Sequence, residues 1–458
     1  MSEAAKSITE PSIPRRQIRW PRAPLAYAQE RMWVLYQLDP LSPAFNISLA
    51  VRLEGKLDVA ALKRALATVA RRHEVLRTTF DVTADGQPFQ SVHPYPSYWP
   101  LSLTDLRSLP DPARDAEVRR LLTAEAARPF NLQTGPTFRT ALICLEMDHQ
   151  VLLLSLHHII ADDGSMDILV RDISVLYGAF VAGTPVPLAN LPVQYPDFAV
   201  WQRQWLQGDV LQKQIDYWRR QFADLPPVLN LPTDFPRRPG QTFCNEREIV
   251  SLNKELSGQV KELARREGAN LFTTLLAAFR LLLHQYSGQE DILIGTSIAN
   301  RNCSSTENLI GFFGNNIVLR INLSGNLTFR ELLARARNVT FDAYAHRDVP
   351  FETLLDTIRP ESRNDRAPLF QVMLVFQSAP LPTLEVDGLK FSLLDSRSET
   401  SNFDLVLYMH ETGQQLSGHL HYNTDLFAAN TIRRLRDRFQ NLLHAVATDP
   451  GARIDALC

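Results

Sequence analysis

The sequence predicts an α/β (α+β) chain that folds as two lobes of similar size. Its 458 residues are too many for one ordinary hydrophobic core. Helix-like and strand-like apolar patterns also mix in both halves of the chain, which is typical of this class. A stretch with four prolines, 183–196, is the best candidate linker between the halves. We therefore expect an N-terminal lobe over 23–182 and a C-terminal lobe over 197–458.

The first half begins with a polar, proline-containing segment, 1–22, which predicts a flexible arm. Apolar residues at three-to-four spacing predict a helix over 59–73 and another of about fifteen residues that starts near Met166. The other elements expected in this half are a strand over 75–81, a charged helix over 114–128 and a hairpin of 138–146 with 150–156.

The second half shows the same mixture of patterns. Helical periodicity alternates with short apolar or β-branched runs, so we expect helices and strands to interleave here as well. The predicted helices are 252–267, 272–285, 327–344 and 431–447, and the predicted strands are 291–297, 371–377 and 403–410.

The composition is that of an ordinary globular protein. Hydrophobic residues make up 45% of the chain, charged residues 21%, and the formal net charge is -2. Nothing in this balance suggests nucleic acid or a membrane surface as a partner. The longest apolar runs are too short or too interrupted to cross a bilayer, and no apolar signal-peptide region opens the chain.

The cysteines give no sign of a metal site or a disulfide framework. Cys144, Cys244, Cys303 and Cys458 lack CxxC or Cys/His spacing, which is typical of isolated thiols in a reducing cytoplasm. Glycine motifs for dinucleotides or nucleoside triphosphates are also missing from the sequence. We therefore expect no metal and no permanently bound cofactor.

The stretch with the strongest chemical signal runs from His157 to Ser165. Two adjacent histidines are followed, four residues after the second, by Asp162. The stretch lies where a predicted strand meets a predicted helix, a rigid support from which side chains can project into a cleft. The plainer alternative is that the histidines end the strand and that Asp162 and Asp163 only cap the helix.

This stretch resembles the HHxxxDG signature of condensation domains of nonribosomal peptide synthetases, within the wider chloramphenicol acetyltransferase-like superfamily. Further stretches resemble other condensation-domain motifs in the right order, and together they cover about residues 24–430. They are AQERMW at 28–33, SPAFN at 42–46, RHEVLRTTF at 72–80, YPDFAVWQ at 195–202, IGFFGN at 310–315, HRDVPF at 346–351, PLFQV at 368–372 and YNTDLF at 422–427.

The resemblance implies a fold and a set of site residues. The fold would be two chloramphenicol acetyltransferase-like lobes in a V-shaped pseudo-dimer with a central tunnel. His158 would act in catalysis as a base or as a stabiliser of the intermediate, and His157 would be mainly structural. The resemblance pairs Asp162 with the arginine of Asn300-Arg301, so Asp162 would hold the active loop. Residues placed near the tunnel are Gly311, Asn315 and Arg77.

The implied reaction is amide formation from an acyl thioester and an amine. A positioned imidazole that accepts the amine proton typically contributes about 10²–10⁴-fold to such a step, and holding both reactants in one closed site contributes further. Substrates would arrive on the phosphopantetheine of carrier proteins or as coenzyme A thioesters. The expected partners are a peptidyl carrier protein, the acyl donor and an adjacent adenylation domain.

One residue departs from the family signature. The glycine after the aspartate is Asp163 here, with Gly164 and Ser165 following. Replacement of the glycine is favoured over an inserted residue, because the helix then keeps its offset from His158. A carboxylate there would either lie close to His158 and influence its charge, or cap the helix and point away from the tunnel.

Several functions remain open at this point. The short segment before the first motif favours a starter domain that transfers a fatty acyl group from acyl-coenzyme A, as in lipopeptide biosynthesis. The alternatives are a chain-elongating domain with a carrier-bound donor, a non-catalytic condensation-like interface, and a free-standing acyltransferase that makes esters. Epimerisation domains share the fold and the histidine motif, but the other motifs fit amide-forming members better.

Overall fold

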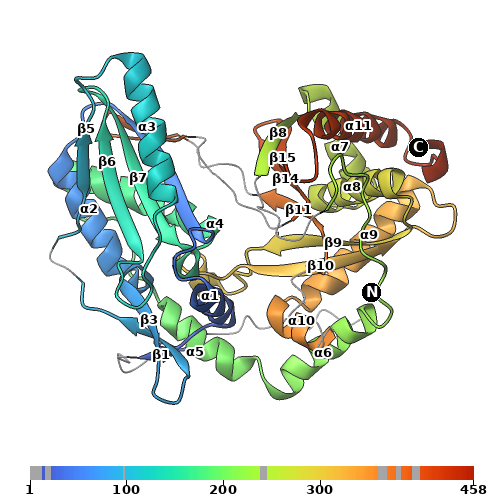
Figure 1. The fold of residues 1–458 in the computed structure, drawn as a ribbon, viewed down its shortest axis with the longest axis horizontal. Coiled ribbons are helices and arrows are strands. Elements are labelled where there is room, and N and C mark those ends of the chain that lie inside the picture. Colours follow the sequence, from blue (N-terminus) through green and yellow to red (C-terminus); the bar gives the residue numbers. More distant parts are fainter. Residues whose placement is uncertain are drawn as a thin grey trace. The chain divides into compact units, whose positions relative to one another are not determined.

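The computed structural model describes residues 13–15, 22–95, 98–237, 245–358, 369–377, 383–394 and 403–457. The chain forms two compact units of mixed helices and strands (Figure 1). Unit 1 comprises Met1–Gln207, Ala299–Gly314 and Leu381–Ser398, and unit 2 comprises Gly208–Ile298, Asn315–Pro380 and Glu399–Cys458. The predicted α/β (α+β) class with two lobes is confirmed.

The boundaries between the units differ from the predicted ones. The expected linker, 183–196, lies within unit 1, because helix α5 (Tyr195–Trp205) packs its buried aromatic residues into the core of that unit. Two segments of the expected C-terminal lobe also belong to unit 1. Strand β13 (Leu389–Leu393) in one of them pairs with β2 (Asn46–Glu54), a long-range contact that local patterning does not reveal. The predicted arm, 1–22, lies outside the described residues apart from 13–15 and 22.

Unit 1 is built around a six-stranded sheet of order β12-β13-β2-β7-β6-β5. The centre of strand β7 (His149–His157) is a continuous apolar run, Val151–Leu154, because both faces of the sheet are covered. Its residues Leu152, Leu154 and Leu156 pack with helices α2 and α4, whereas Val151 and Leu153 pack with α3. Figure 1 shows α2 and α3 on opposite sides of the sheet.

The elements predicted for the first half are present in the predicted order, whereas β1, α1, β2, β4 and β5 were not predicted. Two of its helices begin at an aspartate whose side chain caps the backbone, Asp58 before α2 and Asp162 before α4. The elements are β1 (Ala23–Pro24), α1 (Tyr27–Leu38), α2 (Val59–Arg72), β3 (Thr78–Val82), β4 (Pro88–Val92), β5 (Ser102–Asp105), α3 (Asp111–Ala126), β6 (Phe138–Cys144), α4 (Asp163–Val181) and β12 (Leu384–Val386).

One predicted strand of unit 1 begins too early. Residues 75–81 were expected to be extended, but Glu74–Arg77 forms a 3₁₀ turn and the strand starts at Thr78. The hydroxyl of Thr78 donates to the carbonyl of Glu74, which closes this turn. A short apolar run fits a buried turn as well as a strand, and that ambiguity explains the error.

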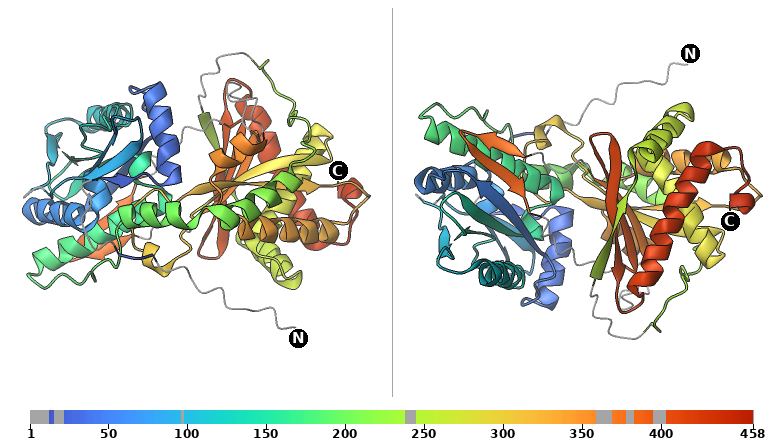
Figure 2. Two further views of the ribbon diagram at one scale, coloured as in Figure 1. Left: turned by 90° about the horizontal axis from the view of Figure 1, so that it is seen from below. Right: turned by 90° about the horizontal axis from the view of Figure 1, so that it is seen from above.

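Unit 2 has a six-stranded sheet of order β10-β9-β11-β14-β15-β8. Helices α7, α8 and α11 lie together on one face of it (Figure 2). The predicted elements are present with ends shifted by a few residues. The elements are α6 (Gly208–Gln221), β8 (Asn245–Ser251), α7 (Lys254–Arg266), α8 (Leu271–Ser287), β9 (Asp291–Ile298), β10 (Asn315–Asn322), α9 (Phe329–Ala345), α10 (Phe351–Ile358), β11 (Val372–Gln377), β14 (Leu405–Thr412), β15 (Gln415–Asn423) and α11 (Ala429–Thr448). None of the described helices is both long and apolar enough to span a membrane.

Candidate active site

The histidine motif occupies a tight connection between β7 and α4 in unit 1. His157 is the last residue of the strand, and His158 opens a 3₁₀ turn, His158–Ile160. Asp162 then caps α4, since its Oδ1 accepts the backbone N–H of Ser165 at 2.9 Å. The predicted position of the motif at a strand-to-helix turn is therefore confirmed.

His157 is a buried residue with a fixed tautomer. Its Nδ1 lies 3.1 Å from the backbone nitrogen of Ile159 and accepts that N–H, so the proton of the neutral ring is on Nε2. Phe45 and Phe130 flank the imidazole ring. Burial, with a smaller contribution from His158, lowers the pKa of His157 to about 3. His157 was predicted among the catalytic residues, and in the structure its side chain stabilises the turn through the hydrogen bond from Ile159.

The buried His157 makes stability depend on pH. In the unfolded chain the pKa of a histidine is about 6.5, so the unfolded state binds a proton more readily than the folded state. The contribution of His157 to stability is complete above pH 6.5 and is lost as the pH falls towards about 3. We expect the free energy of unfolding to fall by up to about 1.4 kcal/mol per pH unit for this residue below pH 6.

Urea unfolding at pH 7, 6 and 5 measures this slope, with His157→Asn as the matched variant. The asparagine Oδ1 can still accept the N–H of Ile159 but does not titrate. Its curve should be flatter than that of the wild type, and equal slopes would contradict the prediction.

His158 is half-buried and is oriented by packing. The ring of Phe312 lies edge-on to the imidazole, with 4.6 Å between centroids. The backbone N–H of His158 donates to the carbonyl of Phe45 at 2.8 Å, which fixes the main chain. Its Nδ1 is buried and has no hydrogen-bond partner among the described residues. The imidazole is thus held at a rigid turn by one aromatic contact.

Asp162 forms the predicted ion pair with Arg301. Nη2 of Arg301 lies 2.8 Å from Oδ1 of Asp162, and both side chains are about nine-tenths buried. The second carboxylate oxygen accepts the backbone N–H of Phe313 at 3.1 Å. The hydroxyl of Ser165 lies 2.6 Å from Oδ1 as well. Asp162 therefore gathers donors from its own helix and from the segment Ala299–Gly314, as the resemblance implied.

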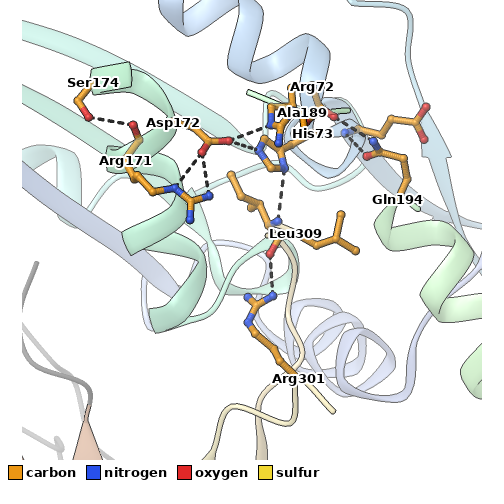
Figure 3. A network of polar contacts seen from close by, with 11 residues as sticks. Arg72, His73, Arg171, Asp172, Ser174, Ala189, Gln194, Arg301 and Leu309 are labelled. Carbon is orange, nitrogen blue, oxygen red and sulfur yellow. Dashed lines mark hydrogen bonds and ion pairs between the residues drawn. The ribbon is translucent and has the colours of Figure 1, made fainter. Parts of the chain in front are cut away.

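The segment Ala299–Gly314, called here the arginine loop, is tied down by side chains. Nη1 of Arg301 donates to the carbonyl of Thr306 at 2.9 Å and to the carbonyl of Leu309 at 2.7 Å. Figure 3 shows the contact with Leu309. The N–H of Gly311 donates to the hydroxyl of Ser165 at 3.0 Å. Buried backbone groups need partners, and in a segment with almost no regular structure these side chains supply them.

Asn300 gives the arginine loop its entry angle. Its backbone φ is 48°, in the left-handed region that asparagine tolerates better than most residues. The amide of Asn302 donates to its side-chain oxygen at 2.8 Å. The predicted structural role of Asn300-Arg301 thus has two parts, a turn at Asn300 and an ion pair at Arg301.

Gly311 must be glycine because Tyr195 leaves no space for a side chain. A Cβ at this position would lie 1.9 Å from Cδ2 of the Tyr195 ring and 2.9 Å from Cε2 of Phe313. The Tyr195 hydroxyl also donates to the carbonyl of Phe312 at 2.5 Å, so the ring cannot swing aside without losing this bond. Gly311 therefore contributes close packing, and its predicted nearness to the tunnel stays a prediction.

We expect Gly311→Ala to lower the free energy of unfolding by about 3 kcal/mol, the upper part of the range for overpacked cores. Gly164→Ala is the matched control. A Cβ at Gly164 has its nearest neighbour at 3.4 Å, an ordinary contact, and alanine is favoured in a helix. Urea unfolding of both variants measures the difference, and equal stabilities would refute the packing argument.

Asp163 replaces the motif glycine without lengthening the turn. Asp162 remains the cap and Asp163 is the first residue of α4, so no residue is inserted between them. The Asp163 side chain is exposed, and a carboxylate in the first turn suits the helix dipole. The structure therefore places the Asp163 carboxylate in the first turn of α4, while the capping itself is done by Asp162.

The two other residues predicted near the tunnel lie in different units. Arg77 is in unit 1, where it donates to the carbonyls of Ala70 and His93 and so holds its own turn. Asn315 is in unit 2, where its amide donates to the carbonyls of Arg347 and Val349 at 2.8 Å each. Both side chains make structural contacts, and their place near a tunnel stays a prediction.

Three residues at the site were not predicted to belong to it. Buried Gln29 donates to the carbonyl of Ile159 at 3.2 Å and so supports the 3₁₀ turn. Tyr195 and Phe312 hold the arginine loop and the His158 ring, as described above. Each lies in a stretch that resembles a family motif, and that membership was the available signal.

Within the described part of the chain, one group of three residues has potential metal-ligand atoms close together. It consists of Glu146, Asp148 and His149 at the turn between β6 and β7. Glu146 and Asp148 are exposed, and exposed acidic clusters are common without a metal. This group is not part of the histidine motif and carries no functional argument.

Residues 21–457 match the family model described as "Condensation domain". The chain belongs to the condensation domain family. Condensation domains of nonribosomal peptide synthetases catalyse amide-bond formation, so the predicted family and enzyme class are confirmed. The site described above contains the family's histidine motif.

This condensation domain is similar to parts of large synthetases. It is 44% identical over 436 residues to a linear gramicidin synthase protein from Brevibacillus parabrevis, covering 95% of this chain and 6% of that protein. A second linear gramicidin synthase protein from the same organism is 46% identical over 436 residues, and the match covers 95% of this chain and 8% of that protein. The condensation domain thus spans less than a tenth of these relatives.

Solved structures show the same fold. The X-domain from teicoplanin biosynthesis superposes with a TM-score of 0.86 and 30% identity, covering 97% of this condensation domain and 99% of that chain. The X-domain in a complex with OxyB gives a TM-score of 0.84 and 31% identity, covering 98% of both chains.

Proposed function

We propose that this condensation domain joins a thioester-bound acyl group to the amine of an aminoacyl group on a peptidyl carrier protein. The amine nitrogen attacks the thioester carbonyl, the C–N bond forms and the C–S bond breaks. The proton lost by the nitrogen leaves with the released thiol. The observation that carries the proposal is the half-buried His158 imidazole, held at a rigid turn by Phe312 and braced by the Asp162–Arg301 pair.

The donor is proposed to arrive on the phosphopantetheine of a second carrier protein. The similarity to the two linear gramicidin synthase proteins supports this chain-elongating function. Carrier and adenylation domains of a synthetase are the proposed partners. The starter alternative, with fatty acyl-coenzyme A as donor and a lipopeptide as product, stays a prediction, since no described residue distinguishes it.

Intact-protein mass spectrometry tests both donors. A panel of aminoacyl-loaded carriers is incubated with the domain and either acyl-coenzyme A or a carrier-bound aminoacyl donor, and His158→Ala serves as the negative control. A mass gain only with the carrier-bound donor would support the proposal. A gain with acyl-coenzyme A would instead support the starter function.

A second candidate function is a non-catalytic interface that recruits another enzyme. It is favoured by the similarity to the X-domain, whose structure in a complex with OxyB shows such a domain bound to a partner protein. Asp163 in place of the motif glycine is the sequence feature that fits it. Failure of the folded domain to react with either donor would favour this function.

The variant Asp163→Gly restores the glycine of the family motif. It tests whether Asp163, and not the choice of carrier proteins, is responsible for a low rate. Because Asp163 is exposed and lies at the start of α4, we expect the rate of amide formation to change by less than about threefold, the size of a surface helix-dipole effect. A much larger gain in the glycine variant, measured with the same carriers, would show that Asp163 suppresses activity.

A further inference from the structure

Besides His157, the buried His73 also contacts the arginine loop. It binds the backbone of Ile310, next to the residue whose carbonyl accepts from Arg301. His73 follows α2 and is 1% exposed, and its partner Asp172 on α4 is fully buried. Nε2 of His73 lies 3.0 Å from Oδ2 of Asp172. Its Nδ1 lies 3.4 Å from the backbone nitrogen of Ile310, in the arginine loop. Figure 3 shows this chain of contacts from Arg171 through Asp172 and His73 towards Leu309 and Arg301.

These contacts define the protonation state of the His73 ring. A backbone N–H can only donate, so Nδ1 must accept from Ile310, and the ring proton is on Nε2, which donates to Asp172. A doubly protonated ring would oppose one N–H to another at Ile310. Burial lowers the pKa of His73 despite the opposing effect of Asp172, which agrees with a neutral ring.

Asp172 does not need a cationic His73 to balance its charge. Its Oδ2 lies 3.0 Å from Nε of Arg72, and its Oδ1 lies 3.0 Å from Nη2 of Arg171. Two guanidinium groups thus compensate one carboxylate. The imidazole can therefore stay neutral, and its Nδ1 accepts the hydrogen bond from the backbone of Ile310.

Ile310 is a sensitive place to anchor the arginine loop. The carbonyl of the neighbouring Leu309 accepts a hydrogen bond from Nη1 of Arg301 at 2.7 Å. Two residues further on, Phe312 contacts the ring of His158 at 4.6 Å. A shift of Ile310 therefore moves the aromatic ring that orients His158.

We propose that His73 is a positioning residue whose neutral imidazole fixes Ile310 and thereby the contact of Phe312 with His158. Its effect on turnover rests on the proposed function of His158, whereas the anchoring of Ile310 does not. The ionisable groups facing the ring among the described residues are Asp172 and Arg171 from α4 and Arg72 beside it. Acidification protonates the ring and releases Ile310.

Two substitutions separate the two nitrogens of the ring. In His73→Asn the side-chain oxygen takes the place of Nδ1 and can accept from Ile310. In His73→Gln the side-chain amide takes the place of Nε2 and can donate to Asp172, but the acceptor for Ile310 is lost. The pair is therefore matched in polarity and differs in which contact it keeps.

Hydrogen–deuterium exchange of the peptide that contains Ile310, together with steady-state kinetics, reads out both effects. We expect roughly tenfold faster exchange in the glutamine variant, since a lost hydrogen bond leaves a buried N–H without a partner. Its kcat should fall roughly 10- to 100-fold with KM unchanged, the effect of a small misplacement. The asparagine variant should resemble the wild type in both at neutral pH. At acidic pH its kcat should fall less than that of the wild type, because the asparagine does not titrate, whereas protonation of the attacking amine lowers both rates.

Equal exchange in the two variants, or faster exchange in the asparagine variant, would overturn the anchoring. Faster exchange in the glutamine variant with unchanged kcat would overturn the positioning role. If the glutamine variant does not fold, the pH profiles of wild type and asparagine variant decide, and identical profiles would refute the proposal. If the wild type forms no amide, the proposed function fails, and the exchange data still judge the anchoring.

Discussion

Replacing Asp162 with alanine should lower the free energy of unfolding by about 3–5 kcal/mol, the typical cost of breaking a buried ion pair from one side. The change leaves the guanidinium of Arg301, whose side chain is 11% exposed, without its carboxylate. It also removes the acceptor for the N–H of Phe313 and the cap of α4. Three stabilising contributions are lost at one residue, and urea unfolding measures their sum.

The adjacent Asp163 provides the control. Asp163 is exposed in the first turn of α4, and a carboxylate at the surface contributes at most about 1 kcal/mol through the helix dipole or an ion pair, which is the expected cost of Asp163→Ala. The variant Arg301→Met removes the other partner. The loss in free energy of unfolding of the double variant Asp162→Ala/Arg301→Met should be smaller than the sum of the two single losses, by about 0.5–3 kcal/mol. Strict additivity would mean that the pair contributes no coupling.

Local sequence patterns were sufficient for helices with a long amphipathic face. The helix expected over 59–73 is α2 (Val59–Arg72), and that expected over 272–285 is α8 (Leu271–Ser287). Helix α2 buries one face, and this burial imposes the three-to-four spacing. Helix α8 is buried on all sides over Thr273–Leu283, and its long apolar run was the signal there. Element ends were less predictable because caps depend on single side chains such as Asp58.

The division into units was not predictable from local patterns. The pairing of Phe391 with Leu53 joins residues far apart in the chain, and nothing in either strand alone specifies the other. The arginine loop likewise belongs to unit 1 although the strands before and after it belong to unit 2. Proline content marked 183–196 as a linker, but burial of Tyr195 and its neighbours in α5 outweighs that signal.

The site was predictable where its residues adjoin in sequence. His157, His158 and Asp162 are in one turn, and the family resemblance supplied Arg301. The contacts of Gln29 with Ile159 and of His73 with Ile310 join residues more than a hundred positions apart. Such contacts arise from tertiary packing, and motif order in the chain gives only the identity of the residues, without their partners.

Replacing His158 with alanine should reduce the rate of amide formation by about 10²–10⁴-fold, the range for loss of a positioned acid–base group. Stability should change little, because the side chain makes no hydrogen bond to another described residue that the change would remove. Single-turnover mass spectrometry of the acceptor carrier measures the rate. Urea unfolding checks the fold, and an active alanine variant would exclude His158 from the chemistry.

His158→Gln separates a base from a stabiliser. For Nε2 to accept the amine proton, the neutral ring must carry its hydrogen on Nδ1, where no acceptor is present among the described residues. A buried N–H without a partner is costly and rare, so the geometry favours the tautomer with the hydrogen on Nε2. That tautomer donates a hydrogen bond to the oxygen on which negative charge develops.

A glutamine amide at position 158 can also donate but cannot take up a proton. We therefore expect His158→Gln to react at least about tenfold faster than His158→Ala, the contribution of one charge-assisted hydrogen bond. Equal rates in the two variants would show that His158 acts as the base.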